Sequence, residues 1–189
     1  MPLTSIPLPY GLRDVKVRGF TDAGATTPAA SAIDLPYGRT FSFSEAEDFE
    51  ELRGDDSTIT TRGKGPAVDW ELESGGVSLA AYQAIAGGAV TALGTTPNQS
   101  NRFRKFTTDS RPFFKVGGQI ISDSGGDFHG ILYRCRATGD LGGEFGDGQF
   151  FLMGAQGRGF GSFEASVLNA LYDLIQNETA TGLTLTTAP

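Results

Sequence analysis

The chain has 189 residues, of which 39% are hydrophobic and 20% are charged, and this composition excludes wholesale disorder. Its formal net charge of −7 disfavours sequence-independent nucleic-acid binding, because such binding depends on Lys and Arg neutralising phosphates. A single cysteine excludes an internal disulfide, and with a single histidine it argues against a zinc cluster. We therefore expect one domain over residues 1–189, without a metal or another cofactor.

No apolar run is long enough to cross a membrane, and the N-terminal stretch MPLTSIPLPYGLRD lacks the basic and apolar regions of a secretory signal. We therefore expect no membrane partner. We also expect the protein to stay in the cytoplasm until it is exported or packaged.

The N-terminal region reads as extended chain followed by a strand. Prolines restrict residues 1–12, which predicts an extended arm rather than a helix. Val15 and Val17 then alternate with charged residues, as in a half-buried strand. A long loop follows over 21–38, and its first part, 21–32, is small, polar and free of periodicity.

Alternation marks the next strands. Phe41 and Phe43 share one face of a predicted strand, and residues 45–63 read as two strands joined by a turn at Gly54–Asp56. The clearest strand is VDWELES, in which Val68, Trp70 and Leu72 alternate with acidic residues. This pattern predicts a sheet with one dry face and one wet face, and it places Trp70 in the core.

The period then changes to that of a helix over 78–87. Ser78 is a good N-cap, the apolar residues that follow have helical spacing, and Gly87–Gly88 is a typical end. Residues 88–111 are predicted to form a second long loop with a small basic cluster.

The remainder predicts three strands and one ambiguous segment. The strands are FFKVGGQIIS, FHGILYRCRA and FFLMGAQG, separated by glycine-rich turns. Residues 164–177 fit either a helix or a last extended strand, and their local pattern favours the helix. The fold class is mainly β, an antiparallel sandwich or barrel with one short flanking helix and long loops.

No arrangement of residues indicates catalysis. His129 lies in an apolar strand, on the same predicted face as Cys135, but six residues of strand separate the two by about 20 Å, too far for a dyad. The many acidic residues show no sign of a buried pair with unequal pKa values, so a solvated acidic face is expected. We therefore predict no enzyme, no catalytic residue and no metal ligand.

Four stretches of the sequence resemble the major tail tube proteins of long, flexible-tailed bacteriophages, notably those of actinobacterial hosts. They cover somewhat under half of the chain, and none is a catalytic signature. The stretches are LPYGLRDVKV (8–17), DLPYGRTFSFSEAEDFEELRGDD (34–56), TTRGKGPAVDWELESGGVSLAAYQAIAGG (60–88) and LYDLIQNETAT (171–181).

The resemblance implies a structural subunit of the virion tail. Such subunits form rings, usually hexameric, that stack into a tube through which double-stranded DNA passes without specific binding. The implied partners are other copies of the chain and the tape measure, terminator and baseplate proteins of the tail. The implied location is the virion tail, and the host cytoplasm before assembly.

Two sets of charged residues are candidates for assembly surfaces. A chain that assembles with its own copies can place an acidic patch against a basic one. The proposed subunit interface consists of Glu47, Asp48, Glu50, Glu51, Arg102, Arg104, Lys105 and Arg111. The proposed acidic stripe, facing the tube lumen or solvent, consists of Asp69, Glu71 and Glu73. The alternative for both sets is a solvated surface.

Three other functions remain open. A β-sandwich that binds carbohydrate is the second choice, although few aromatic residues are expected at the surface for stacking on a sugar. Another virion component, such as a tail terminator or a capsid protein, would have the same composition. An enzyme with carboxylate chemistry ranks lowest.

Overall fold

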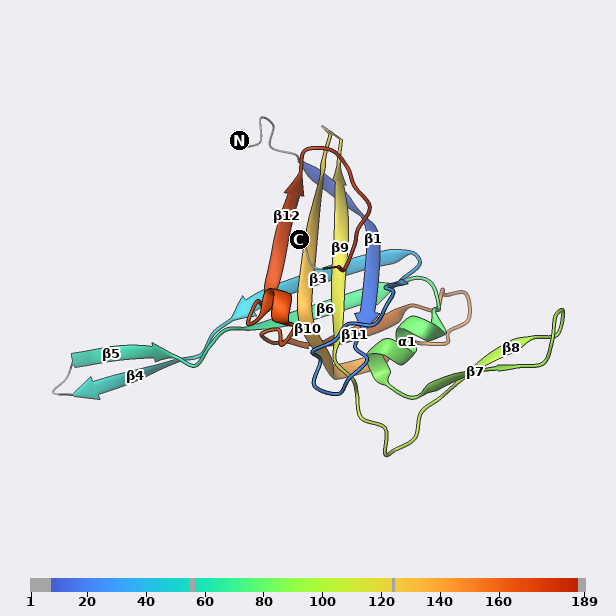
Figure 1. Ribbon diagram of the computed structural model, residues 1–189, viewed down its shortest axis with the longest axis horizontal. Coiled ribbons are helices and arrows are strands. Elements are labelled where there is room, and N and C mark those ends of the chain that lie inside the picture. Colours follow the sequence, from blue (N-terminus) through green and yellow to red (C-terminus); the bar gives the residue numbers. More distant parts are fainter. Residues whose placement is uncertain (1–7, 55–56, 124, 187–189) are drawn as a thin grey trace.

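The computed structural model describes residues 8–54, 57–123 and 125–186 and has a mainly β architecture (Figure 1). One eight-stranded antiparallel sheet, two separate two-stranded hairpins and one short helix confirm the predicted fold class. The elements are β1 (Pro9–Gly19), β2 (Ile33–Asp34), β3 (Gly38–Ala46), β4 (Phe49–Gly54), β5 (Ser57–Gly63), β6 (Ala67–Ser74), α1 (Leu79–Ala86), β7 (Ala89–Leu93), β8 (Ser100–Arg104), β9 (Phe114–Ser122), β10 (Asp127–Gly142), β11 (Met153–Gly159), the 3-10 turn η1 (Ala165–Val167) and β12 (Tyr172–Asn177).

The long strand β10 is the centre of the main sheet. Along one edge it pairs with β9, and along the other edge it pairs first with β12 and then with β11. Beyond β9 the order continues to β1 and β2, and beyond β11 it continues to β6 and β3. The sheet thus divides at β10, and the branch β11–β6–β3 folds over the other strands.

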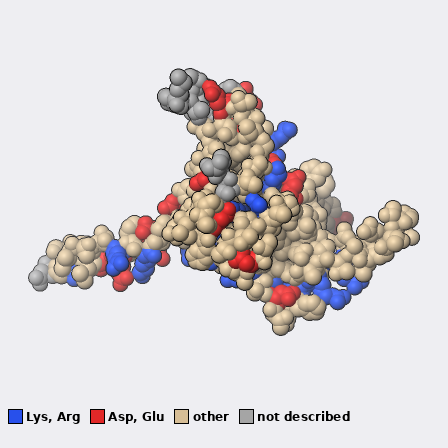
Figure 2. All heavy atoms as spheres, in the orientation of Figure 1, with Lys and Arg blue, Asp and Glu red and all other residues tan. Residues whose placement is uncertain are grey.

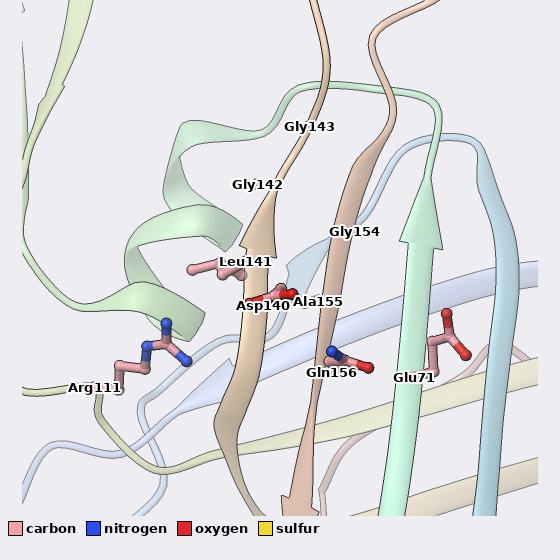
Figure 3. A pocket seen from close by; sticks show the side chains of 9 residues that line it. All are labelled: Glu71, Arg111, Asp140, Leu141, Gly142, Gly143, Gly154, Ala155 and Gln156. Atoms are coloured by element: carbon pink, nitrogen blue, oxygen red, sulfur yellow. The ribbon is translucent and has the colours of Figure 1, made fainter.

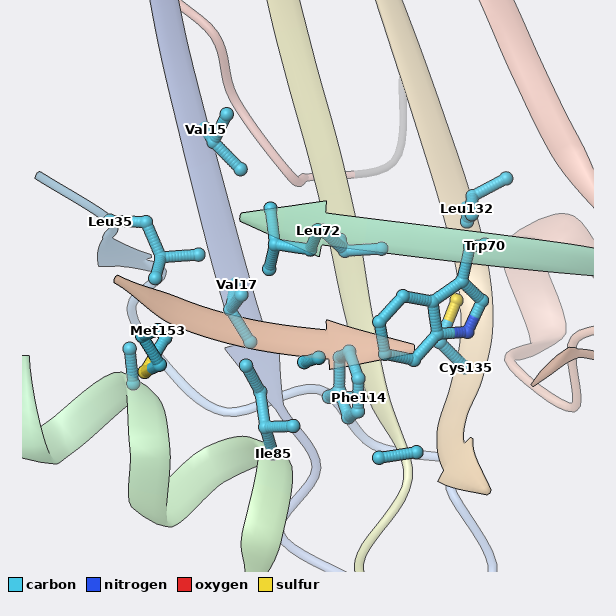
Figure 4. Packing of buried hydrophobic residues seen from close by; sticks show 14 of the residues in the cluster. Val15, Val17, Leu35, Trp70, Leu72, Ile85, Phe114, Leu132, Cys135 and Met153 are labelled. Atoms are coloured by element: carbon cyan, nitrogen blue, oxygen red, sulfur yellow. The ribbon is translucent and has the colours of Figure 1, made fainter. Parts of the chain in front are cut away.

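The main core lies between these two parts of the sheet. In Figure 1 the strands β3, β6 and β11 run across β1, β9 and β10 at a steep angle, as in orthogonally packed sheets. Figure 4 shows Trp70 and Leu72 of β6 opposite Phe114 of β9 and Val17 of β1. Trp70 is only 3% exposed and meets the Phe114 ring edge to face, with 5.4 Å between centroids. The prediction of a buried Trp70 is confirmed.

Two glycines lie where a side chain would be crowded, Gly118 between the two layers and Gly157 between paired strands of one layer. A side chain at Gly118 of β9 would lie 2.6 Å from the ring of Phe41, which crosses from β3. A side chain at Gly157 of β11 would lie 2.7 Å from the Trp70 indole. Both positions therefore need a residue without a Cβ atom.

The helix α1 closes one end of the core, where its Ala81 and Ile85 are buried. Its ends match the sequence prediction. The Ser78 side chain accepts a hydrogen bond from the Ala81 amide, and Gly87 adopts a φ of 76° and donates to the carbonyl of Gln83.

Two hairpins project from the body of the molecule in opposite directions (Figure 1). The pair β4–β5 confirms two strands over 45–63, although residues 55 and 56 of the predicted turn lie outside the described residues. The pair β7–β8 corrects the predicted loop over 88–111, because residues 89–104 form a hairpin instead. Its β-branched and aromatic residues favour strands, but they are too few to reveal a period.

The other predicted loop and the predicted arm are shorter than expected. Within 21–38, β2 pairs with β1, and the Asp22 carboxylate accepts hydrogen bonds from the amides of Thr26 and Thr27. Within 1–12, residues 9–12 already belong to β1 and pair with β9, whereas residues 1–7 lie outside the described part of the chain.

The favoured helix over 164–177 is wrong, and the alternative of a last strand is correct. Within this segment only η1 is helical, and Asn169, two residues after its end, has a φ of 64°, which is incompatible with a continuing helix. Residues 172–177 form β12, because the first half of β10 has a free edge that supplies hydrogen bonds to a strand. Tertiary pairing thus overrides a local helical pattern.

A second, smaller core lies on the opposite face of β9 and β10. Ile131 and Tyr133 of β10 pack there against Leu183 and Leu185. These two leucines belong to residues 181–185, which we call the C-terminal strap. Lys16 and Arg18 of β1 donate hydrogen bonds to the carbonyls of Leu183 and Leu185 and so hold the strap down.

Candidate assembly surfaces

The acidic stripe lies on the outer face of β6, as its alternation predicts. Asp69 and Glu71 are exposed and Glu73 is half-buried, while the residues between them face the core. Asp69 forms an ion pair with Arg158 of β11 at 3.1 Å, and Glu73 forms one with Arg39 of β3 at 3.4 Å. The wet face of β3, β6 and β11 is therefore polar but not uniformly negative.

An open depression of about 610 Å³ lies on this wet face (Figure 3). Glu71 and Gln156, which are paired across β6 and β11, form one part of its wall, and Arg111 and Asp140 form another. Its ionisable side chains are those of Glu71, Arg111 and Asp140, and no Ser, Thr, Cys or His lines it. Across the described residues there is also no cluster of three or more possible metal ligands among His, Cys, Asp and Glu.

The predicted acidic interface residues lie on the β4–β5 hairpin or at its base. All four are exposed, Glu50 and Glu51 on β4 and Glu47 and Asp48 just before it. Glu51 pairs with Arg53 at 2.8 Å, and Glu50 with Lys64 at 3.6 Å. These pairs stay within the hairpin and face solvent, so they do little to fix it against the body of the molecule.

The predicted basic residues separate into two kinds. Arg102 and Arg104 are exposed on β8, and no ion pair joins them to the described part of the chain. Lys105 instead donates a hydrogen bond to the carbonyl of Ala86 at the end of α1. Arg111 is half-buried and donates to the carbonyls of Ala137 and Gly139 at 3.1 and 2.7 Å. Two of the four basic residues thus have a structural role inside the subunit.

The acidic and basic sets do not meet within one copy. The β4–β5 hairpin projects on one side of the molecule and the β7–β8 hairpin on the other (Figure 1). In Figure 2 acidic and basic atoms are mixed along the first projection, whereas basic atoms gather near the base of the second. Any contact between the two sets therefore joins different copies.

Exposed apolar side chains on the β4–β5 hairpin are a feature that the sequence analysis missed. Phe49, Leu52 and Ile59 are each more than half exposed, because a two-stranded hairpin has no second layer to cover them. The signal available in the sequence is an apolar residue on each strand, within stretches otherwise made of charged residues and threonines. Such side chains on a long projection are typical of a surface that another chain covers.

Several aromatic rings are also exposed elsewhere, which corrects the expectation of few surface aromatics. They are distributed over different elements rather than gathered into one platform. The rings are those of Tyr10, Tyr37, Phe106, Phe145, Phe150 and Phe163.

The only histidine takes part in a buried polar network under the C-terminal strap. Asp127 accepts hydrogen bonds from Gln119 at 2.7 Å, Asn177 at 2.6 Å and the Thr181 amide at 2.8 Å, and it lies 2.9 Å from His129 Nε2. Burial alone would raise the pKa of Asp127, but these hydrogen bonds together lower it below its usual value. The network anchors the strap to β9, β10 and β12.

Cys135 does not share a face with His129, contrary to the sequence prediction. The pairing of β10 with β9 shifts register between Leu132 and Cys135, and this irregularity turns Cys135 into the main core. Burial raises the pKa of the Cys135 thiol well above its ordinary value. An unreactive thiol on the opposite face of the sheet cannot act with this histidine.

Comparisons with known proteins add no relative to this description. A scan against protein-family models finds no match to the chain, and a search of curated proteins finds none either. No helix in the described ranges is long and apolar enough to span a bilayer. The fold, the exposed surfaces and the resemblance of the four sequence stretches are therefore the observations that bear on function.

Proposed function

We propose that this protein is a structural subunit of a bacteriophage virion, which assembles with its own copies into stacked rings that form the tail tube. The observation that carries the proposal is the pair of oppositely directed hairpins, one of which exposes apolar side chains that its own subunit cannot cover. A ring is the closed form of such head-to-tail contacts, and we expect six copies by analogy with tail tube proteins.

The main sheet has features that suit a ring. The outer edge of β3 pairs with no strand within the described residues, so it is available to a neighbouring copy. The wet face of β3, β6 and β11 is polar and is backed by the dry core. In the proposed tube this face lines the lumen, where the ion pairs of Asp69 and Glu73 leave Glu71 as the acidic residue of the stripe that most disfavours adhesion of DNA.

The proposal includes the partners and location that the tail tube resemblance implies. The rings contact the tape measure, terminator and baseplate proteins, and the tube conducts double-stranded DNA without specific binding. The subunit resides in the host cytoplasm before assembly and in the virion tail afterwards. We expect this subunit to have no catalytic activity.

Electron microscopy and sedimentation velocity of the purified protein test this proposal. We expect rings or tubes above a threshold concentration, and a rise in sedimentation coefficient at the same concentration. Dispersed monomers at every concentration and salt would contradict it. Another virion component, such as a terminator, would give isolated rings that do not stack on one another.

A carbohydrate-binding module is the second candidate, and the exposed aromatic rings are the observation in its favour. Trp70 is excluded as the stacking platform because it is buried. A glycan array with the monomeric protein distinguishes the two functions. Specific glycan binding without assembly would favour the module.

A further inference from the structure

An apolar groove of about 480 Å³ lies beside the base of the β7–β8 hairpin. Three parts of the chain form it: α1 with the residues before it, Phe103 of β8, and the segment from Gly142 to Met153. The Tyr82 ring meets Phe103 edge to face at 4.9 Å between centroids, and the rings of Phe145 and Phe151 lie 4.7 Å apart. The groove thus has aromatic walls contributed by distant parts of the sequence.

The rim of the groove is unusually exposed for apolar residues. Val77 is 58% exposed and Phe145 is 92% exposed, although both line the groove. Removing these apolar surfaces from water favours association with a partner. A partner segment that fills the groove therefore needs apolar side chains of its own.

The β4–β5 hairpin carries such side chains on a narrow projection. Leu52, which is paired with Thr60, is 58% exposed. Ile59, which lies at the bulge between this pair and the next, is 63% exposed. A side chain at Gly54 would touch Ile59 at 2.7 Å, so this glycine leaves one side of the isoleucine open. The hairpin presents branched aliphatic groups suited to aromatic walls.

The charges of the two projections are opposite. Residues 47–64, the β4–β5 hairpin with its base, contain six acidic and three basic residues. Residues 89–105, which include the β7–β8 hairpin, contain three basic residues and no acidic one. Arg102 and Arg104 flank Phe103 along β8 and point to the opposite face of the strand, so the cationic side chains lie near the groove but do not line it. Such complementarity sets orientation and speeds encounter more than it adds affinity.

We propose that the β4–β5 hairpin of one copy docks in the apolar groove of the next copy. Leu52 and Ile59 fill the groove between Phe103 and Phe145, and the acidic residues of the hairpin come near the basic face of β8 that carries Arg102 and Arg104. This inference rests on the proposed function and names the contact that joins the subunits. Because hairpin and groove are different surfaces of one chain, the contact is head-to-tail and propagates through a ring or a filament.

Two variants with complementary defects test the proposed contact. The hairpin variant Leu52→Asp/Ile59→Asp keeps an intact groove, and the groove variant Val77→Asp/Phe145→Asp keeps an intact hairpin. All four positions are more than half exposed, so both monomers are expected to fold. Each variant alone should remain monomeric at concentrations where the wild type assembles.

An equal mixture of the two variants gives the decisive result. The intact hairpin of the groove variant should enter the intact groove of the hairpin variant, and growth should stop there because both remaining surfaces are defective. Sedimentation velocity should therefore show a one-to-one dimer, which should form more weakly when Arg102→Glu and Arg104→Glu are added to the hairpin variant. The control Ala165→Asp/Leu168→Asp adds the same charge at exposed positions of another segment and should assemble like the wild type.

The outcomes separate this inference from the proposed function. If either defective variant forms rings or tubes as the wild type does, the docking contact is wrong while the tube function stands. A mixture that stays monomeric also overturns the contact. If the wild type itself never assembles, both proposals fail.

Discussion

The main sheet and the β4–β5 hairpin are both built from antiparallel strands, but only the strands of the sheet are covered by a second layer. In β6 every second side chain enters the core, whereas in β4 and β5 no side chain is buried. An isolated two-stranded hairpin is marginally stable in water, because it has no layer to pack against. The main sheet therefore makes the subunit stable, whereas the hairpin is available for contacts with another copy.

The largest change in stability is expected for a residue on the buried face of β6. Trp70→Ala should lower the free energy of unfolding by about 3–5 kcal/mol, since it removes a large aromatic side chain from the main core. Glu71→Gln, the next residue on the same strand, should leave stability nearly unchanged. Urea denaturation of both variants measures the difference. Equal tolerance at the two positions would contradict the assigned faces of β6.

A buried ion pair in the sheet gives the next prediction. The side chain of Lys115 is 0% exposed, and its ammonium pairs with Glu164. Glu164→Ala should cost about 3 kcal/mol, because it leaves a buried charge without its partner. The double variant Lys115→Met/Glu164→Ala should recover most of this loss in the same denaturation assay. A double variant as unstable as the single one would show that packing, not charge, is responsible.

The strap should respond to acid through Asp127. Because the folded-state pKa of Asp127 is lowered, its contribution to stability is present above the unfolded pKa of about 3.9 and is lost as the pH falls below it. Asp127→Asn should therefore cost about 1–3 kcal/mol at pH 7, and less at pH 3. Thermal unfolding across this pH range measures the effect. Parallel curves for wild type and variant would argue against it.

The smallest expected effect concerns the uncovered hairpin. Leu52→Ser should change the stability of the monomer by less than about 0.5 kcal/mol, since the Leu52 side chain is 58% exposed. Trypsin should cleave free subunits after Arg53 or Arg62 and should spare these sites in the assembled state, if a partner covers the hairpin. Identical cleavage in both states would contradict the docking contact.

Strands whose period reflects burial within the chain were predictable from the sequence. β6 and α1 were correct because alternation and end caps are local properties. β12 was not the favoured prediction for its segment, since its apolar residues also fit helical spacing and its partner β10 begins 45 residues earlier in the chain. The face of Cys135 was wrong because a register shift leaves no mark in composition.

The candidate surfaces were predictable only in part. Charge clusters are visible in the sequence, so the exposed positions of Glu50 and Arg102 were expected. The hydrogen bonds that Lys105 and Arg111 donate within the subunit were not expected, because their acceptors are backbone carbonyls of α1 and β10, which are distant in the sequence. The groove was also missed, since its walls come from three separate segments.

The C-terminal strap has a consequence for the timing of folding. Ile131 and Tyr133 of β10 are covered by Leu183 and Leu185, each of which is 52 residues further along the chain. At ordinary rates of synthesis this separation corresponds to a delay of roughly 3–10 s. During that interval one face of β9 and β10 is without its cover and is available to wrong partners. A nascent subunit is therefore most prone to aggregation late in its synthesis, just before the strap emerges.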